Sequence, residues 1–161
     1  MVGPSRRRSR LIAEVETLYA WIDEQLAQDT VRSGQCRACG DCCDFVGYDH
    51  LLFVTPPELI YIAEKLGVER LKRMTSGRCP YQQALKCTVH AHRFSGCRIF
   101  GCQGNAEFQS ELTETALSRL KAMCEQFDIP YRYADLATAL ANFTADSDPS
   151  AAEPCPEDCA G

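Results

Sequence analysis

Four cysteines stand close together in the first third of the sequence, with a spacing that suits metal chelation: Cys36, Cys39, Cys42 and Cys43. Two residues between thiols let a turning backbone direct both sulfurs at one ion, and Gly40 supplies the conformational freedom that such a loop needs. A C-x2-C-x2-C run is also how bacterial ferredoxins wrap an iron–sulfur cluster, with a Cys-Pro at a distance. Cys79 precedes Pro80 here. The run therefore predicts a thiolate site for zinc or for an iron–sulfur cluster of the 4Fe–4S type.

Four further cysteines bring the supply to eight, and we predict all eight as metal ligands: the four above with Cys79, Cys87, Cys97 and Cys102. Neighbouring side chains on an extended chain point in opposite directions. Cys42 and Cys43 are therefore expected to serve different centres, unless one of them lies outside the coordination shell. Eight thiolates suffice for two four-thiolate sites, which would bind two zinc ions, two clusters or one of each. They also suffice for one site with spare thiols.

Basic residues lie within a few positions of these cysteines, and Arg37 and Arg98 are each next to one of them. Thiolates around one ion leave the site anionic, and nearby cations lower thiol pKa values and donate hydrogen bonds to sulfur. We therefore predict that Arg37 and Arg98 stabilise the bound cofactor by interacting with its thiolate ligands and not with the metal itself. The alternative is that both guanidinium groups are solvated at the surface, where arginine is common.

The remaining cysteines and histidines are weaker candidates. Cys124 lies on the apolar stripe of a predicted helix, where a free cysteine packs as a small hydrophobic residue. His90 and His92 lie near the later cysteines and offer nitrogen ligands, but eight thiols already suffice. Cys155 and Cys159 form a C-x3-C pair in an acidic stretch near the C-terminus. Thiols without basic neighbours are more often bystanders than ligands.

The composition fits one soluble domain in a reducing compartment. The chain has 161 residues, 45% of them hydrophobic, with 11 cysteines and a formal net charge of −5. A chain of this length can bury a core without disulfides, and an odd number of cysteines fits complete pairing poorly. We find no export signal and no apolar run of membrane-spanning length, so we expect a cytoplasmic protein that has no membrane partner and whose reduced thiols favour metal. Because the chain as a whole is acidic, its arginine-rich start is a poor nucleic-acid site.

Four helices are predicted around the cysteine-rich segment. The first covers residues 11–28, and its buried face is formed by Leu11, Val15, Leu18, Ile22 and Leu26. Thr55 and Glu58 form a capping box at the start of the second helix. The third runs from a cap at Asn105 to about residue 127, and the fourth covers residues 133–143.

Small β elements and two tails complete the prediction. Residues 51–54 form a short strand, and residues 86–90 are either its partner or an arm of a separate hairpin. A basic tail over residues 1–10 and an acidic tail over residues 144–161 are expected to be disordered, which leaves one cysteine-cluster metal-binding domain over residues 11–143. The predicted fold class is mainly α with small β elements, in which helices clamp an irregular cysteine-rich segment.

The signature segment, from about residue 35 to residue 104, resembles the YkgJ-like cysteine-cluster family, also described as zinc- or iron-chelating CxxCxxCC proteins. The matching motifs are the opening four cysteines, Val54-Thr55 with Glu58, Cys79-Pro80, Cys87, and Cys97-Arg98-x-Phe100-x-Cys102. The sequence departs from the family pattern in turns and at no cysteine. His90 stands where the family has tyrosine, and Phe94 and Gly101 each stand where it has proline. The resemblance implies metal binding by the eight cysteines. The methylase activity of some relatives is not carried over, because the chain has no glycine-rich nucleotide loop.

Three functional classes follow from these observations. The first is an iron–sulfur protein in electron transfer or redox sensing. The second is a zinc-stapled module that binds an unidentified protein partner, with the metal supplying folding energy. The third is a cluster-dependent enzyme or methylase accessory, for which the sequence shows no assigned base, nucleophile or substrate pocket. The cysteine spacing places the iron–sulfur hypothesis slightly ahead.

Overall fold

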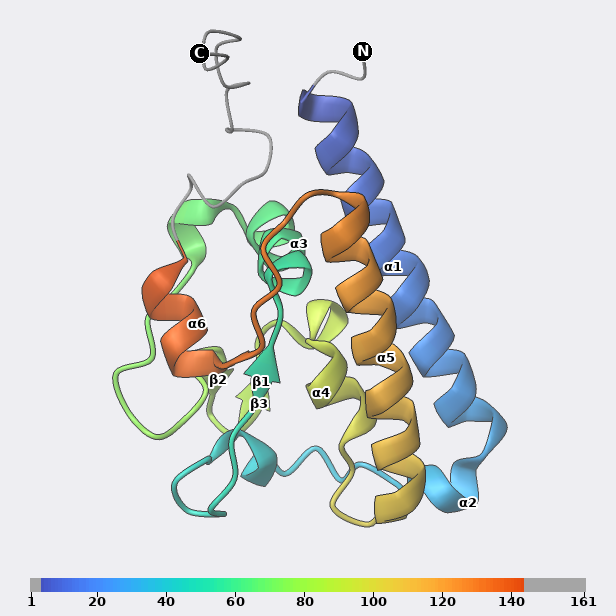
Figure 1. Cartoon of the computed structure of the whole chain (residues 1–161). Coiled ribbons are helices and arrows are strands. Elements are labelled where there is room, and N and C mark those ends of the chain that lie inside the picture. The colour runs from blue at the N-terminus through green and yellow to red at the C-terminus, as the bar shows by residue number, and fades with distance from the viewer. Residues whose placement is uncertain (1–3, 144–161) are drawn as a thin grey trace, which may run out of the picture.

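The computed structural model describes residues 4–143. It consists mainly of helices, with two small antiparallel strand pairs (Figure 1). The predicted fold class, mainly α with small β elements, is confirmed. Residues 1–3 and 144–161 lie outside the described residues, and with them the predicted acidic tail and its Cys155 and Cys159. Among the described residues, no helix combines the length and the apolar composition that a membrane crossing requires.

The elements follow one another along the chain in the order of their labels. The helices are α1 (Pro4–Gln28), α2 (Thr30–Ser33), α3 (Pro56–Leu66), α4 (Ser95–Ile99), α5 (Ala106–Gln126) and α6 (Leu136–Asn142). Three single 3-10 turns cover Asp41–Cys43, Val68–Arg70 and His90–His92. The strands are β1 (Phe53–Val54), β2 (Gln82–Gln83), β3 (Lys86–Cys87) and β4 (Ala134–Asp135).

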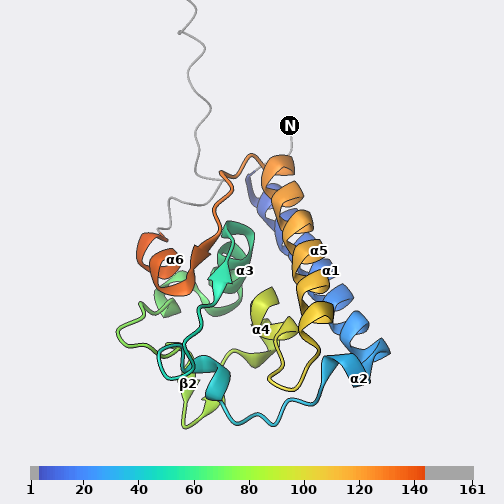
Figure 2. The same cartoon turned by 60° about the horizontal axis from the view of Figure 1, so that its bottom comes forward.

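The long helices α1 and α5 lie side by side along one side of the molecule, and α3 and α4 pack against them (Figures 1 and 2). Apolar residues recur every three or four positions on both long helices, so that each presents one stripe to the other. These stripes form the first hydrophobic cluster, whose members include Leu11, Val15, Leu18, Ile22, Phe108, Leu112, Ala116 and Leu120. The predicted inward faces of both helices are thereby confirmed.

A second hydrophobic cluster supports the cysteine-rich segment. It joins α3 and α6 to the segments before and after α3 and consists of Phe45, Val54, Leu59, Ile62, Tyr81, Val89, Phe94, Leu136 and Leu140. Cys79, Cys87 and Cys97 are partly buried against this cluster. The irregular segment is therefore held by packing on helices, as predicted.

The strand predicted over residues 51–54 pairs with a segment that the sequence did not suggest. β1 is antiparallel to β4, with Phe53 opposite Asp135. β4 takes up the first residues of the helix predicted over 133–143, so that α6 begins at Leu136. β2 pairs with β3, which shows that residues 86–87 belong to a separate hairpin arm, one of the two predicted alternatives.

The prediction of a disordered tail over residues 1–10 is wrong for residues 4–10, which form the first turns of α1. Two arginines there form ion pairs with side chains far along the chain. Arg7 lies 2.7 Å from Asp128, beyond the end of α5, and Arg8 lies 2.8 Å from Glu64 in α3. The four arginines near the N-terminus favoured a prediction of disorder, because the sequence does not show that some of them have acidic partners elsewhere in the fold.

Candidate metal centre

An antiparallel bridge between two loop segments sets Cys43 directly opposite Cys79. Asp44 pairs with Arg78 at the centre of the bridge, and the backbone N–H of Cys79 donates to the carbonyl of Cys43 over 2.8 Å. Residues opposite each other on antiparallel segments share a face, with β-carbons about 4.5–5.5 Å apart. The two thiols are accordingly close enough to be hydrogen bonded.

Three thiols form a hydrogen-bonded chain in which Cys42 donates to Cys43 and Cys43 donates to Cys79. Its hydrogen bond to Cys43, followed by burial, raises the pKa of Cys42. The bond from Cys42 lowers the pKa of Cys43, but the bond to Cys79, burial and the charges of Cys79 and Cys87 outweigh it and raise that pKa to about 11. The bond from Cys43 lowers the pKa of Cys79 despite burial. Of the three, Cys79 most readily becomes the thiolate that a metal requires.

Two more thiols, Cys87 from β3 and Cys97 from α4, interact with these three through their charges. The five are here called the inner group: Cys42, Cys43, Cys79, Cys87 and Cys97. Burial raises the pKa of Cys97 well above the usual range, and the charges of Cys43, Cys42 and Cys87 add to this rise. All members except Cys42 are half-buried. A cation among these thiols would favour their thiolate forms, so the chemistry of the donor set fits a thiolate-bound metal.

The other three predicted ligands, Cys36, Cys39 and Cys102, are exposed and are called the outer group. The loop that begins at Gly34 runs against the connection between α4 and α5. A β-carbon on Gly34 would lie 2.7 Å from the carbonyl carbon of Gln103. Cys36 and Cys102 therefore lie on adjacent segments. Within residues 4–143, no three side chains of His, Cys, Asp or Glu are grouped as they would be around a metal ion.

The segment that carries both groups matches a family model over residues 35–127, and the family is described as a zinc- or iron-chelating domain. The match covers more than half of the chain. The chain belongs to the CxxCxxCC family. The resemblance seen in the motifs is thereby confirmed, and the match continues beyond the last motif through α5. Neither the curated proteins nor the solved structures provide a match.

Gln82 holds the CxxCxxCC loop against the β2–β3 hairpin. Its side-chain N–H donates to the carbonyl of Gly40 over 2.6 Å, and its side-chain oxygen accepts from Arg78 over 3.3 Å. Gly40 has a φ of 78°, and a β-carbon there would lie 2.5 Å from the carbonyl oxygen of Leu85. The predicted need for glycine at this position is confirmed. No sequence signal pointed to Gln82, because its role depends on the hairpin pairing.

The two arginines predicted to support the cofactor make other contacts. Arg37 donates to the side-chain oxygen of Gln103, with Nη2 2.7 Å from that oxygen. Arg98 donates to two backbone carbonyls and to Asp23. The guanidinium that acts on the inner group is that of Arg93, whose charge opposes the rise in pKa of both Cys42 and Cys97. No sequence signal pointed to Arg93, although it lies four residues before Cys97.

His50, His92 and Cys124 make contacts that do not involve the other thiols. Nε2 of His50 lies 3.0 Å from the carbonyl oxygen of Cys42, and its ring stacks on Phe100. Nδ1 of His92 lies 3.1 Å from the hydroxyl of Tyr61. Cys124 is 1% exposed within the first hydrophobic cluster, which confirms its prediction as a core residue.

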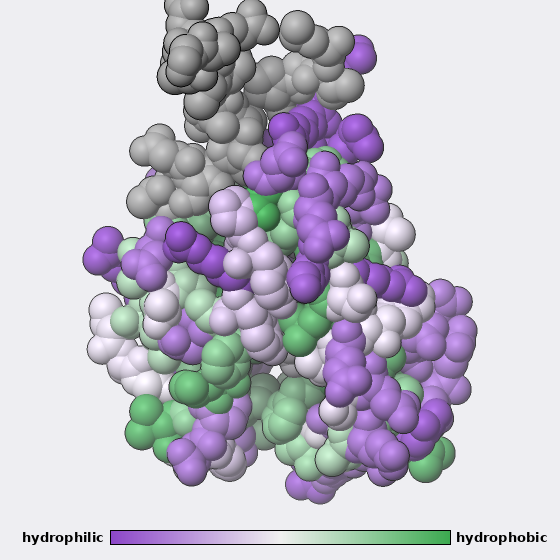
Figure 3. All heavy atoms as spheres, viewed as in Figure 1, coloured by the Kyte–Doolittle hydropathy of each residue, from purple (hydrophilic) through white to green (hydrophobic). Residues whose placement is uncertain are grey.

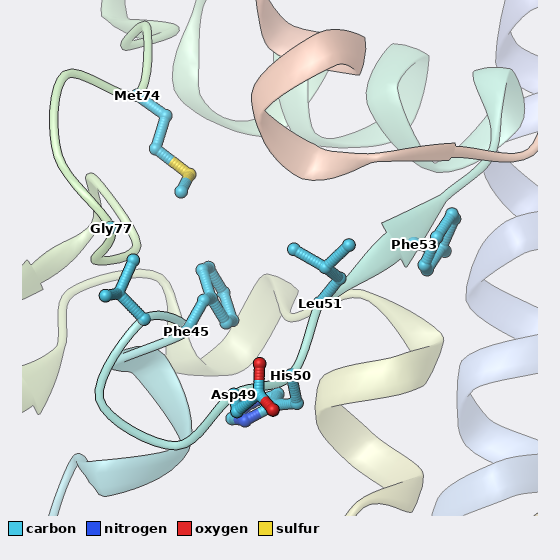
Figure 4. Close-up of a pocket in the computed structure, with 8 residues that line it drawn as sticks. Phe45, Asp49, His50, Leu51, Phe53, Met74 and Gly77 are labelled. Carbon is cyan, nitrogen blue, oxygen red and sulfur yellow. The ribbon is translucent and has the colours of Figure 1, made fainter.

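A groove beside the inner group is lined mostly by apolar residues: Phe45, Val46, Asp49, His50, Leu51, Phe53, Met74 and Gly77. Figure 4 shows Met74 reaching from the loop after α3 into the same space as Phe45 and Leu51. Val46 and Leu51 are 77% and 62% exposed. Apolar side chains also gather on the lower left of the face in Figure 3, below α6. The site is therefore bordered by apolar surface in contact with solvent.

Proposed function

We propose that the protein binds a metal through the inner group, as an iron–sulfur cluster of the 4Fe–4S type that serves electron transfer or redox sensing. The observation that carries this proposal is the bridge that sets Cys43, next to Cys42, opposite Cys79. The charges of Cys87 and Cys97 interact with these thiols. Membership of a zinc- or iron-chelating family supports the metal. Cys79-Pro80 supports the cluster, and the C-x2-C-x2-C run contributes Cys42 to the inner group.

In this proposal the four half-buried thiolates of the inner group are the ligands of the cluster. The exposed thiols of Cys36, Cys39, Cys42 and Cys102 are four further donors, enough for a second four-thiolate site. A bound cluster would supply a one-electron couple. Arg93 offsets part of the thiolate charge, and packing on the second hydrophobic cluster limits the access of water, two factors that adjust the potential of such a site. Free thiols in this number suit a reducing compartment such as the cytoplasm.

The second candidate is a zinc-stapled module whose function lies in a protein interface. The exposed apolar groove beside the inner group favours it, because contiguous apolar surface in contact with solvent is typical of interaction sites. In this case a tetrahedral zinc held by four thiolates would order the irregular segment, and an unidentified protein partner would bind the groove.

The test is anaerobic purification followed by analysis for iron, acid-labile sulfide and zinc, with a visible spectrum of the same sample. We expect a brown protein with matched iron and sulfide, and we expect Cys43→Ser to lose both. A colourless protein with one or two zincs per chain would replace the redox proposal with the interaction module. A protein that holds neither metal, even after reconstitution, would overturn both.

A further inference from the structure

We infer that Glu58 is a positioning residue for the metal centre, because its buried carboxylate fixes the start of α4 and thereby the placement of Cys97. The inference rests on the proposed function, since it concerns a ligand of the same site. Glu58 lies on α3, far from every cysteine in the sequence, and matches a motif of the family whose role the cysteine chemistry alone does not explain.

The carboxylate of Glu58 accepts hydrogen bonds on both oxygens and is 1% exposed. Oε2 accepts from the backbone N–H and the hydroxyl of Thr55, over 3.0 and 2.9 Å. Oε1 accepts from the backbone N–H and the hydroxyl of Ser95, over 2.8 and 2.6 Å, and from the hydroxyl of Tyr19 over 3.4 Å. The capping box of α3 accounts for Oε2 only. Oε1 is directed at the first residue of α4.

α4 needs this external acceptor. It has five residues, Ser95–Ile99, and its cap residue, Phe94, offers no side-chain hydrogen bond. The N–H groups at a helix start have no partner within the helix, and so short a helix is not stable by itself. Glu58 satisfies the N–H of Ser95 from another helix. Cys97 lies two residues further on, within the same turn.

The other end of α4 is tied to α1. The guanidinium of Arg98 lies 4.3 Å from the ring centroid of Tyr19, and its Nη1 lies 2.8 Å from Asp23. Cys97 is therefore placed between two anchors, Glu58 before it and Arg98 after it. Its thiol is partly buried against the second hydrophobic cluster, as are those of Cys79 and Cys87. A side chain held in this way loses little conformational entropy when it binds a metal.

The sharpest experiment uses two substitutions that each remove one hydroxyl donor from the same carboxylate. Ser95→Ala removes the donor on the α4 side, and Thr55→Val removes the donor on the α3 side. Both leave a backbone N–H bonded to Glu58. We expect Ser95→Ala to shorten the half-time of metal loss to excess EDTA several-fold. We expect Thr55→Val to lower the unfolding temperature while its half-time stays that of the wild type.

Glu58→Gln extends the test, because an amide cannot accept from both backbone donors. Loss of a residue that orients a ligand typically costs about 10- to 100-fold in metal affinity, and we expect a loss of this size. Leu120→Ala, in the first hydrophobic cluster, serves as the control for general destabilisation. Affinity is measured by Co2+ titration at a temperature at which every variant is folded by circular dichroism. The Co2+ spectrum of Glu58→Gln should also differ from that of the wild type, whereas that of Leu120→Ala should not.

The outcomes separate the two proposals. If the wild type retains metal and Ser95→Ala and Thr55→Val lose it at equal rates, Glu58 has only a structural role and the inference is overturned while the proposed function stands. If the wild type binds no metal, both fail. If Glu58→Gln does not fold, the comparison of Ser95→Ala with Thr55→Val decides by itself.

Discussion

Asp44 and Arg78 form an ion pair, with Oδ2 of Asp44 2.7 Å from Nη2 of Arg78, at the centre of the bridge that sets Cys43 opposite Cys79. The Asp44 carboxylate also accepts from the backbone N–H of Gly47 over 2.9 Å. Because the Arg78 side chain is 50% exposed, solvent screens the pair. Its main consequence is the alignment of two loop segments that share no regular strand.

Arg78→Gln is therefore expected to lower the free energy of unfolding by only about 0.2–1 kcal/mol, as for other exposed pairs. It should nevertheless speed metal loss, because the bridge that aligns Cys43 with Cys79 is weakened. Urea unfolding of the metal-free protein and EDTA challenge of the loaded protein measure the two effects. Arg7→Gln, which breaks the pair with Asp128, is the control and should leave metal loss unchanged. Equal metal loss in both variants would contradict the expectation.

Cysteine substitutions should divide into two classes. Cys43→Ser and Cys39→Ser are expected to reduce bound metal and to loosen the fold, since metal binding supplies folding energy. Cys124→Ser should keep its metal, because the side chain is buried among apolar residues of α1 and α5. Elemental analysis of the three purified variants, with thermal unfolding of each, provides the measurement. Metal loss in Cys124→Ser as large as in Cys43→Ser would show this division to be wrong.

The turn between β2 and β3 contains backbone strain that two substitutions should relieve. Ala84 and Leu85 have φ values of 48° and 62°, in the left-handed region that two-residue hairpins favour and that non-glycine residues populate at a cost. Ala84→Asn combined with Leu85→Gly is expected to stabilise the metal-free protein by about 1 kcal/mol. Urea unfolding measures the gain. The reverse sign would show that the Leu85 side chain stabilises the turn by more than its backbone strain costs.

Stability should fall at alkaline pH in a way that depends on Cys124. Burial, with a smaller effect of Glu125, raises the pKa of Cys124 to about 11. An unfolded cysteine ionises near pH 8.5, so the stabilisation is complete below that pH and is lost as the pH rises towards 11. The loss should reach about 2–3 kcal/mol. Urea midpoints between pH 8 and 11 should therefore fall more steeply for the wild type than for Cys124→Ala, and parallel curves would refute the assignment.

Local sequence signals predicted the elements whose determinants lie within a few residues. Asn105 begins α5 and accepts from the N–H of Phe108, because the asparagine cap acts only on the next turn. Thr55 begins α3 for the same reason, with Glu58 in the capping box. The apolar stripes of α1 and α5 also depend only on helical periodicity.

Features that depend on distant partners were not predictable in this way. The N-terminal turns of α1 form ion pairs with Asp128 and Glu64, and β1 pairs with a strand some eighty residues later in the chain. The same limit applies to the candidate site. The cysteine spacing identified the candidate thiols. Their arrangement in space depends on the bridge between Asp44 and Arg78 and on the placement of α4, which the spacing does not determine.

The presence of two hydrophobic clusters implies that the molecule can open in parts. α1 and α5 share the first cluster, while the cysteine-rich segment rests on the second. Local opening can then release the thiols without separating the long helices. Amide exchange would proceed in two stages, with the loops over residues 36–43 and 79–87 exchanging ahead of α1 and α5. A metal could in this way enter and leave a chain that stays folded.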